Sequence, residues 1–323
     1  LKVMNTPDDV IDLASVYVKT YFMGMPAVMV YNFGAAILRS TGDTKRALYI
    51  LSCSGVVNVA LNLVFVIAFE WNVFGVGLAT AISQFISAIL IVFCLVKEKS
   101  CVKLEIKKLK IYTKKLLRIL QIGVPAGFQG MMFSLSNVVI QSSINSFGKT
   151  VVAASAASVS VEGFAFTSMN AFHQATVSFT SQNKGAGKFD RINKILYVSL
   201  FYVFAVGSVF CAVFLLFGDN LIGIYTDSPE VVAEGVKRLT IIACSYMLCG
   251  MMDVMVGSLR GLGYSVMPML VSLVGACGLR LLFIFTLFQL PMFHSMSALY
   301  MMYTVTWTVT LLAHVICFTI VRK

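Results

Sequence analysis

Four ionisable side chains lie inside long apolar stretches of this 323-residue sequence, namely Glu162, His173, Asp253 and Arg280. Charged groups are costly to bury in such surroundings, so they commonly have a function. A buried carboxylate can take up a proton, bind Na⁺ or pair with an organic cation, and it can exchange one for another. Glu162 and Asp253 are therefore the candidates for cation coupling or substrate binding, and either could bind Na⁺. A structural role is the alternative, and Arg280, which lies at a similar depth to Glu162, would then be its partner.

Further polar residues accompany these groups and predict a cleft. Gln129, Asn137 and Gln141 are spaced by eight and then four positions, which places them on one face of a helix. Such a face can line a wet cleft and hydrogen-bond a substrate, or it can hold helices together. His173 can equally be a bundle histidine with satisfied hydrogen bonds. The residues that we expect to line the cleft are Gln129, Asn137, Gln141, Asn170, His173, Gln174 and Arg280.

The apolar stretches that position these residues are long enough to be membrane helices. Hydrophobic residues make up 59% of the chain and charged residues 12%, whereas a soluble domain has roughly 25% charged residues. About 20 apolar residues cross a membrane as a helix. The sequence predicts an all-α polytopic membrane protein with nine helices, over residues 10–38, 46–69, 74–96, 113–146, 151–180, 193–217, 231–258, 265–289 and 296–320.

The distribution of charge predicts the orientation in the membrane. With nine helices, most of the 25 Lys and Arg residues fall in the loops on one side, and Glu70, Asp219 and Asp227 fall on the other. Basic loops stay on the cytoplasmic side. We therefore expect a multi-pass plasma-membrane protein whose basic loops and C-terminus are cytoplasmic. The net charge of +11 is explained by this topology and by contact with membrane lipids, so we expect no nucleic-acid partner.

One loop sequence occurs twice. Arg39 and Arg260 lie 221 positions apart, as do Gly42 and Gly263, within ILRSTGDTK and SLRGLGYSV. Each copy follows an acidic start and a long apolar stretch, and both copies run in the same direction through the membrane. Such copies indicate a parallel repeat, related by an axis along the membrane normal.

The repeat also predicts the domain organisation. The first three helices match the last three, so the middle three have no counterparts among the nine. This predicts a protein of twelve helices in two bundles of six, of which this chain lacks the first three. The domains expected are a partial N-terminal lobe of three helices (1–96), an amphipathic cytoplasmic linker (97–112) and a complete six-helix C-terminal lobe (113–323).

Five short motifs give the chain a resemblance to a known family. They occur in order as LRSTGDTK (Leu38–Lys45), IGVPAGFQ (Ile122–Gln129), INSFGKTVVAA (Ile144–Ala154), FTSQNKGAGK (Phe179–Lys188) and SLRGLGYS (Ser258–Ser265). With these motifs the chain resembles the multidrug and toxic compound extrusion (MATE) transporters, aligned to their fourth to twelfth helices. The resemblance implies a secondary antiporter that exports cationic amphipathic compounds in exchange for Na⁺ or H⁺, through a central cleft between two lobes.

The chain departs from the family pattern in one respect. Some members carry an acid in the helix that corresponds to 113–146, whereas this chain has no acid between Ile119 and Gly148. Other members depend on an acid in the first helix, which lies outside this sequence. The choice between Na⁺ and H⁺ therefore stays open.

Two other functions compete with drug export. A lipid-linked oligosaccharide flippase of related fold should line its cleft with several basic residues, but the sequence places only Arg280 deep in a helix. An inactive transporter fragment is the other alternative. The sequence has no H-E-x-x-H and no nucleophile motif, so we expect no enzyme. We expect no cofactor beyond the coupling ion, with small organic cations and membrane lipids as partners of a monomer.

Overall fold

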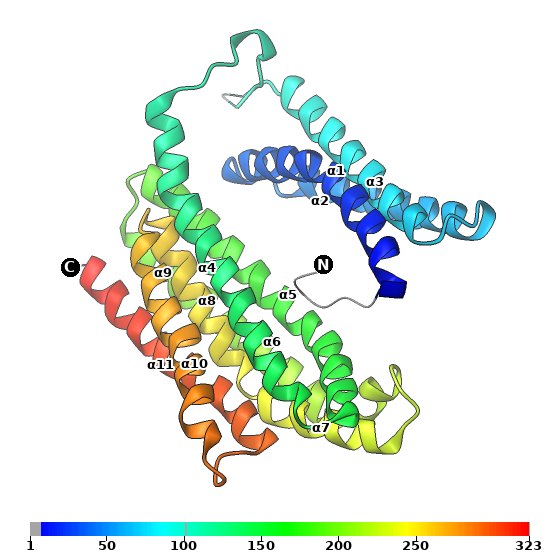
Figure 1. Ribbon diagram of the computed structural model, residues 1–323. Coiled ribbons are helices and arrows are strands. Elements are labelled where there is room, and N and C mark those ends of the chain that lie inside the picture. Colours follow the sequence, from blue (N-terminus) through cyan, green and yellow to red (C-terminus); the bar gives the residue numbers. More distant parts are fainter. Residues whose placement is uncertain (1–7, 101, 323) are drawn as a thin grey trace. The chain divides into compact units, whose positions relative to one another are not determined.

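The structure, a computed structural model, describes residues 8–100 and 102–322 (Figure 1). Nearly all of this described chain is helical, and none of it forms a strand. The all-α fold predicted from composition is confirmed.

The predicted number of membrane helices needs a correction. Seven described helices are long and apolar enough to cross a membrane, and α7 with α8 makes an eighth if this bent pair is one span. The fourth predicted span, 113–146, corresponds to α4 (Thr113–Asn145), which is long enough but is not in this set. Its glutamines, serines and glycines lower the hydropathy of α4. Composition and the nine-helix prediction therefore disagree on α4.

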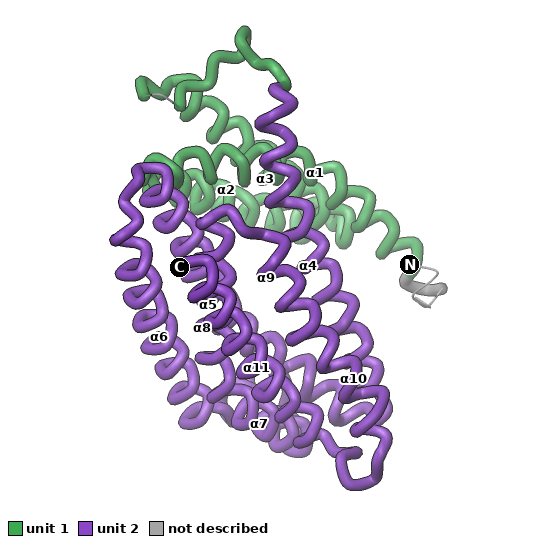
Figure 2. Tube along the Cα trace, turned by 90° about the vertical axis from the view of Figure 1, so that its left-hand side faces the viewer, with its two compact units in different colours: residues 1–111 green, residues 112–323 purple. Residues whose placement is uncertain are grey.

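The chain forms two compact units, residues 1–111 and 112–323 (Figure 2). Unit 1 consists of α1 (Asp8–Ser40), α2 (Lys45–Leu63) with a π-helical end (Val64–Ala68), and α3 (Asn72–Val96). Both α1 and α2 pack against α3. Its core includes Leu38 and Ile91, neither of which is exposed. A 3₁₀ turn, Ile106–Lys108, is the one helical element described between Val96 and Thr113.

Unit 2 is a bundle arranged around α5 (Lys149–Gly185), which packs against α4, α6, α7 and α8. The other bounds are α6 (Asp190–Gly223), α7 (Pro229–Ala243), α8 (Tyr246–Gly261), α9 (Val266–Ser272), η4 (Leu273–Gly278), α10 (Leu279–Phe285), η5 (Leu287–Gln289) and α11 (Met296–Arg322). Its largest apolar core joins residues of α5, α6, α7, α8 and α11.

Glycines let α8 approach α5 closely. A Cβ added at Gly257 would lie 2.9 Å from the backbone oxygen of His173, and one at Gly261 would lie 2.6 Å from Cβ of Thr180. Any side chain at these positions would therefore push the two helices apart. Asp253 lies four residues before Gly257, so it is held at the edge of this contact.

The two copies of the repeated loop form the same turn. Gly42 and Gly263 both have a φ of +88°, a conformation that glycine adopts without steric cost. In the first copy the N–H of Gly42 donates to the oxygen of Arg39 over 3.0 Å, and that of Asp43 donates to Leu38. Gly263 donates to Arg260 over 2.8 Å in the same way. These bonds are those of a Schellman C-cap, so the sequence repeat is also a repeat of local structure.

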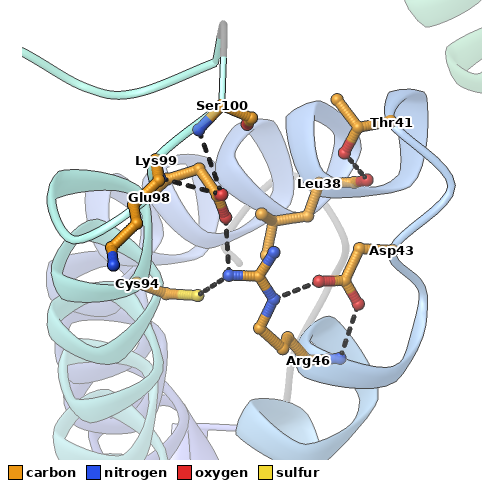
Figure 3. Close-up of polar contacts among 8 residues, drawn as sticks. All are labelled: Leu38, Thr41, Asp43, Arg46, Cys94, Glu98, Lys99 and Ser100. Carbon is orange, nitrogen blue, oxygen red and sulfur yellow. Dashed lines mark hydrogen bonds and ion pairs between the residues drawn. The ribbon is translucent and has the colours of Figure 1, made fainter.

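The α1–α2 turn of unit 1 carries a charged cluster with Arg46 at its centre (Figure 3). The Arg46 guanidinium pairs with Asp43 and, over 2.6 Å, with Glu98 at the end of α3. Hydrogen bonds from the backbone and side chain of Arg46 lower the pKa of Asp43. The side-chain hydrogen bond from Arg46 lowers the pKa of Glu98, helped by the backbone N–H of Lys99. The cluster therefore connects the turn to α3 and neutralises part of the basic loop.

A break between α7 and α8 is the feature that the sequence did not predict. The two helices meet at an angle of 46°. Pro26 and Pro125 lie inside helices that continue without interruption. The break has no proline and occurs at Cys244 and Ser245. Ser245 instead shares a hydrogen bond with Thr304 of α11.

The position of this break can be tested by cross-linking. Sγ of Cys244 lies 3.2 Å from Sγ of Cys211 in α6, and a disulfide needs about 2.0 Å. Mild oxidation with copper phenanthroline should therefore join these two cysteines after a small movement. Mass spectrometry of the purified chain would identify the linked peptides, and Cys211→Ser should abolish the link. If both thiols stay free to alkylation after oxidation, α6 and the break are not placed as described.

Candidate functional site

Unit 2 encloses a cavity of about 750 Å³, which we call the chamber. Residues of α4, α5, α7, α8, α10 and α11 line it. Helices far apart in the sequence therefore contribute to one site. All nine residues that the sequence singled out lie on its wall, namely Gln129, Asn137, Gln141, Glu162, Asn170, His173, Gln174, Asp253 and Arg280. Their roles in coupling or substrate binding stay predictions.

Glu162 is buried and forms an ion pair with Arg238. Nε of Arg238 donates to Oε1 over 2.8 Å, and Nη2 donates to Oε2 over 3.0 Å. The hydroxyl of Tyr246 donates to Oε2 over 3.1 Å, and Nη1 of Arg238 donates to Ser155 over 2.9 Å. A two-bond contact of this kind is the strongest geometry for an arginine and a carboxylate. The structural alternative considered from the sequence named Arg280 as the partner, but the partner is Arg238.

Arg238 is the functional-site residue that the sequence reasoning missed. It follows Lys237 just past the middle of α7, where two adjacent basic residues suggest an exposed stretch of helix. Lys237 does lie at the surface and pairs with Glu234 over 2.5 Å. The signal was the spacing of the apolar residues Val231, Leu239 and Ile242, which places Arg238 on the buried face of an amphipathic helix.

Asp253 has a different environment from Glu162. It is partly exposed, and its carboxylate has no hydrogen bond or ion pair within the part of the chain that the structure describes. Cys249, Asp253, Val256 and Arg260 all line the chamber, and their spacing of four, three and four places them on one face of α8. Asp253 is therefore the free carboxylate of the chamber.

Hydrogen bonds hold the chamber wall around Asp253. Nδ1–H of His173 donates to the backbone oxygen of Asp253 over 2.7 Å. A carbonyl oxygen only accepts, so this bond fixes the histidine tautomer. Nη2 of Arg260 donates to Oε1 of Gln129 over 2.9 Å, which connects α8 to α4. His173 and Gln129 thus act here as structural contacts as well as wall residues.

Arg280 is 3% exposed and faces the chamber from α10. Nε donates to Oγ1 of Thr306 over 3.1 Å. The guanidinium lies 4.2 Å from the ring centroid of Tyr303 and 5.4 Å from that of Trp307. Nη2 has no hydrogen-bond partner within the described residues. The sequence was right that Arg280 lies deep, but two further arginines, Arg238 and Arg260, also line the chamber.

The chamber therefore combines a neutralised acid, a free acid and a buried arginine among amides and aromatic rings. No group of three or more His, Cys, Asp or Glu residues within the described chain could hold a metal ion. A Na⁺ ion at Asp253 would have to take its other ligands from amide, backbone or water oxygens.

Helices long and apolar enough to cross a membrane, arranged around a polar chamber, define the molecule as a polytopic membrane protein. A model of the MatE family matches residues 1–64 and 125–286, most of the chain. The chain belongs to the MatE family, as its motifs indicated. Members of this family are transporters, so the prediction that the protein is not an enzyme is confirmed.

Named relatives support the same family. The probable multidrug resistance protein YoeA of Bacillus subtilis (strain 168) is 26% identical over 288 residues, which cover 87% of this chain and 62% of YoeA. YpnP of the same strain, also a probable multidrug resistance protein, is 29% identical over 280 residues, with the same two coverages of 87% and 62%. The chain thus spans less than two thirds of either relative.

Solved structures share the fold. The chain matches a mutant form of the Vibrio cholerae MATE transporter VcmN with a TM-score of 0.89 and 19% identity, over 99% of this chain and 72% of that one. The bent form of VcmN gives a TM-score of 0.87 with 18% identity, over 100% of this chain and 72% of the other. The helical architecture is therefore that of MATE transporters.

Proposed function

We propose that the protein is a multidrug efflux transporter, a secondary antiporter that exports cationic amphipathic compounds in exchange for Na⁺ or H⁺. The observation that carries this proposal is the free carboxylate of Asp253 in a chamber of about 750 Å³. The names of YoeA and YpnP, which refer to multidrug resistance, support it. We place the protein in the plasma membrane with its basic loops and C-terminus in the cytoplasm.

Antiport requires two ligands that exclude each other at a shared group, or that favour opposite states of the protein. Asp253 can supply such a group, because a proton, Na⁺ or an organic cation can each neutralise it and none has to break an existing ion pair. Glu162 is less suited, since Arg238 already neutralises it over 2.8 Å. We therefore assign coupling to Asp253, and to Glu162 the role of holding α5 against α7.

A flippase for lipid-linked oligosaccharides is the second candidate. The argument that only Arg280 lies deep does not hold, because Arg238 and Arg260 also line the chamber. However, Glu162 neutralises Arg238, and Asp253 lies on the same face of α8 as Arg260. The chamber wall thus carries little net positive charge for a pyrophosphate group, and export of cations remains better supported.

The test is efflux from proteoliposomes that contain the product of the complete reading frame. Ethidium is loaded inside, and a Na⁺ or a proton gradient is imposed separately. We expect one of the two gradients to drive ethidium out, and an ionophore that collapses this gradient to stop the movement. Efflux no faster than from protein-free liposomes under both gradients would contradict the proposal.

A further inference from the structure

Arg280 lines the chamber and carries a buried hydrogen-bond donor that has no partner among the described residues. Its side chain is buried, and Nη2 has no partner among the described residues. Leaving a buried donor unpaired is energetically costly, and more so when the group is charged. No ion pair is found between Arg280 and a carboxylate in the described chain: Glu162 pairs with Arg238, and the carboxylate of Asp253 is free. Arg280 therefore has no carboxylate partner among the described residues.

The surroundings of Arg280 hold its guanidinium in one orientation. Thr306 accepts from Nε over 3.1 Å, and the ring of Tyr303 lies 4.2 Å away. Trp307 adds a second aromatic contact on the chamber wall. A planar guanidinium that is fixed in this way is suited to bind a carboxylate or phosphate through two parallel bonds. The neighbouring rings would accommodate the aromatic body of the same ligand.

We infer that Arg280, with Thr306, Tyr303 and Trp307, forms an acid-accepting subsite within the chamber. Its ligand is an amphipathic aromatic molecule that carries a carboxylate, sulfonate or phosphate group. A ligand that also carries a positive charge could neutralise Asp253 at the same time, so zwitterions should bind best. The inference that such a molecule is transported rests on the proposed export function. Its binding to the chamber, however, can be measured without transport.

Two matched dyes test the inference. Rhodamine B carries a cationic ring system and a free carboxylate, and rhodamine B ethyl ester has the same ring system with the acid blocked. Binding of each dye to the purified 323-residue chain in detergent is followed by fluorescence anisotropy, with empty micelles as background. A hydrogen bond to a charged group contributes about 1.5–3 kcal/mol, so we expect the acid to bind at least about tenfold more tightly than the ester.

Substitutions at Arg280 test whether this residue causes the preference for the acid. Arg280→Gln should remove the preference for the acid, so that the acid and the ester bind with similar affinity. Arg280→Lys keeps the positive charge but not the planar guanidinium, so it should show a reduced preference for the acid. It replaces Arg280→Gln in the test if the Gln variant does not fold. Lys237→Gln removes a cation at the surface of α7, outside the chamber wall, and should bind like the parent.

Equal affinity of the parent for both dyes would overturn the inference. An undiminished preference for the acid in Arg280→Gln would also overturn it. If only Arg280→Lys folds, an undiminished preference in that variant would have the same consequence. An acid preference that depends on Arg280, in a protein that shows no gradient-driven efflux, would support the subsite and contradict the export function. The two proposals can therefore fail separately.

Discussion

Replacing Arg238 with Met is expected to destabilise unit 2 by about 3–5 kcal/mol, the usual cost of breaking a buried ion pair from one side. The change leaves the carboxylate of Glu162 buried, with Tyr246 as its remaining hydrogen-bond donor. Thermal unfolding in detergent, followed by intrinsic fluorescence, would measure the loss. Trp307 is a suitable reporter because its ring lies 5.7 Å from that of Tyr246.

A double variant separates the lost pair from a general packing defect. Adding Glu162→Gln to Arg238→Met removes the unpaired charge, so most of the lost stability should return. Lys237→Met is the matched control, since Lys237 is 64% exposed, and it should change stability by no more than about 0.5 kcal/mol. If Arg238→Met unfolds at the same temperature as the parent, the buried pair is not part of the folded protein.

Asp253→Asn is expected to reduce gradient-driven ethidium efflux by about tenfold or more. Two opposite charges 4 Å apart interact by about 1 kcal/mol in water and about 4 kcal/mol at an effective dielectric constant of 20, and the chamber lies between these limits. The amide keeps the shape of the side chain but cannot exchange a proton or neutralise a cation. Efflux from proteoliposomes under the same gradient would measure the change.

The structure also predicts how this variant should differ from Glu162→Gln. The carboxylate of Asp253 has no hydrogen bond or ion pair to lose in the described chain, so Asp253→Asn should unfold at the parent's temperature. Glu162→Gln leaves Arg238 without its carboxylate, so it should unfold earlier and retain gradient coupling in the fraction that is folded. From the sequence alone, Glu162 and Asp253 were candidates for the same role. Full efflux by Asp253→Asn would show that the free carboxylate is structural.

Much of this site could be predicted from the sequence, because polar groups are costly to bury in apolar surroundings and their positions therefore indicate a cavity. Polar residues inside apolar helices must face a cavity or one another, and helical spacing places Gln129, Asn137 and Gln141 on one face. All three line the chamber. The Arg-x-x-Gly turns were predictable for a similar local reason, since the glycines at 42 and 263 both require a positive φ.

What could not be predicted depends on contacts between helices. Spacing along a helix shows which residues share a face, but it does not show which neighbouring helix that face meets. Glu162 therefore has Arg238 of α7 as its partner instead of Arg280 of α10. The break at Cys244 and Ser245 involves a contact with Thr304, 59 residues further along the chain, which no local pattern reports.

The most direct test of the central claim, that Asp253 exchanges the coupling ion for the substrate, is ion release on ligand binding. Purified chain in weakly buffered detergent is titrated with ethidium while a pH indicator records protons and ²²Na⁺ records sodium. We predict the release of about one proton or one Na⁺ per bound ethidium, since one carboxylate holds a single proton or neutralises a single charge. Asp253→Asn should release neither, whereas Glu162→Gln should behave like the parent. The same release from Asp253→Asn, or none from the parent with ethidium bound, would contradict the claim.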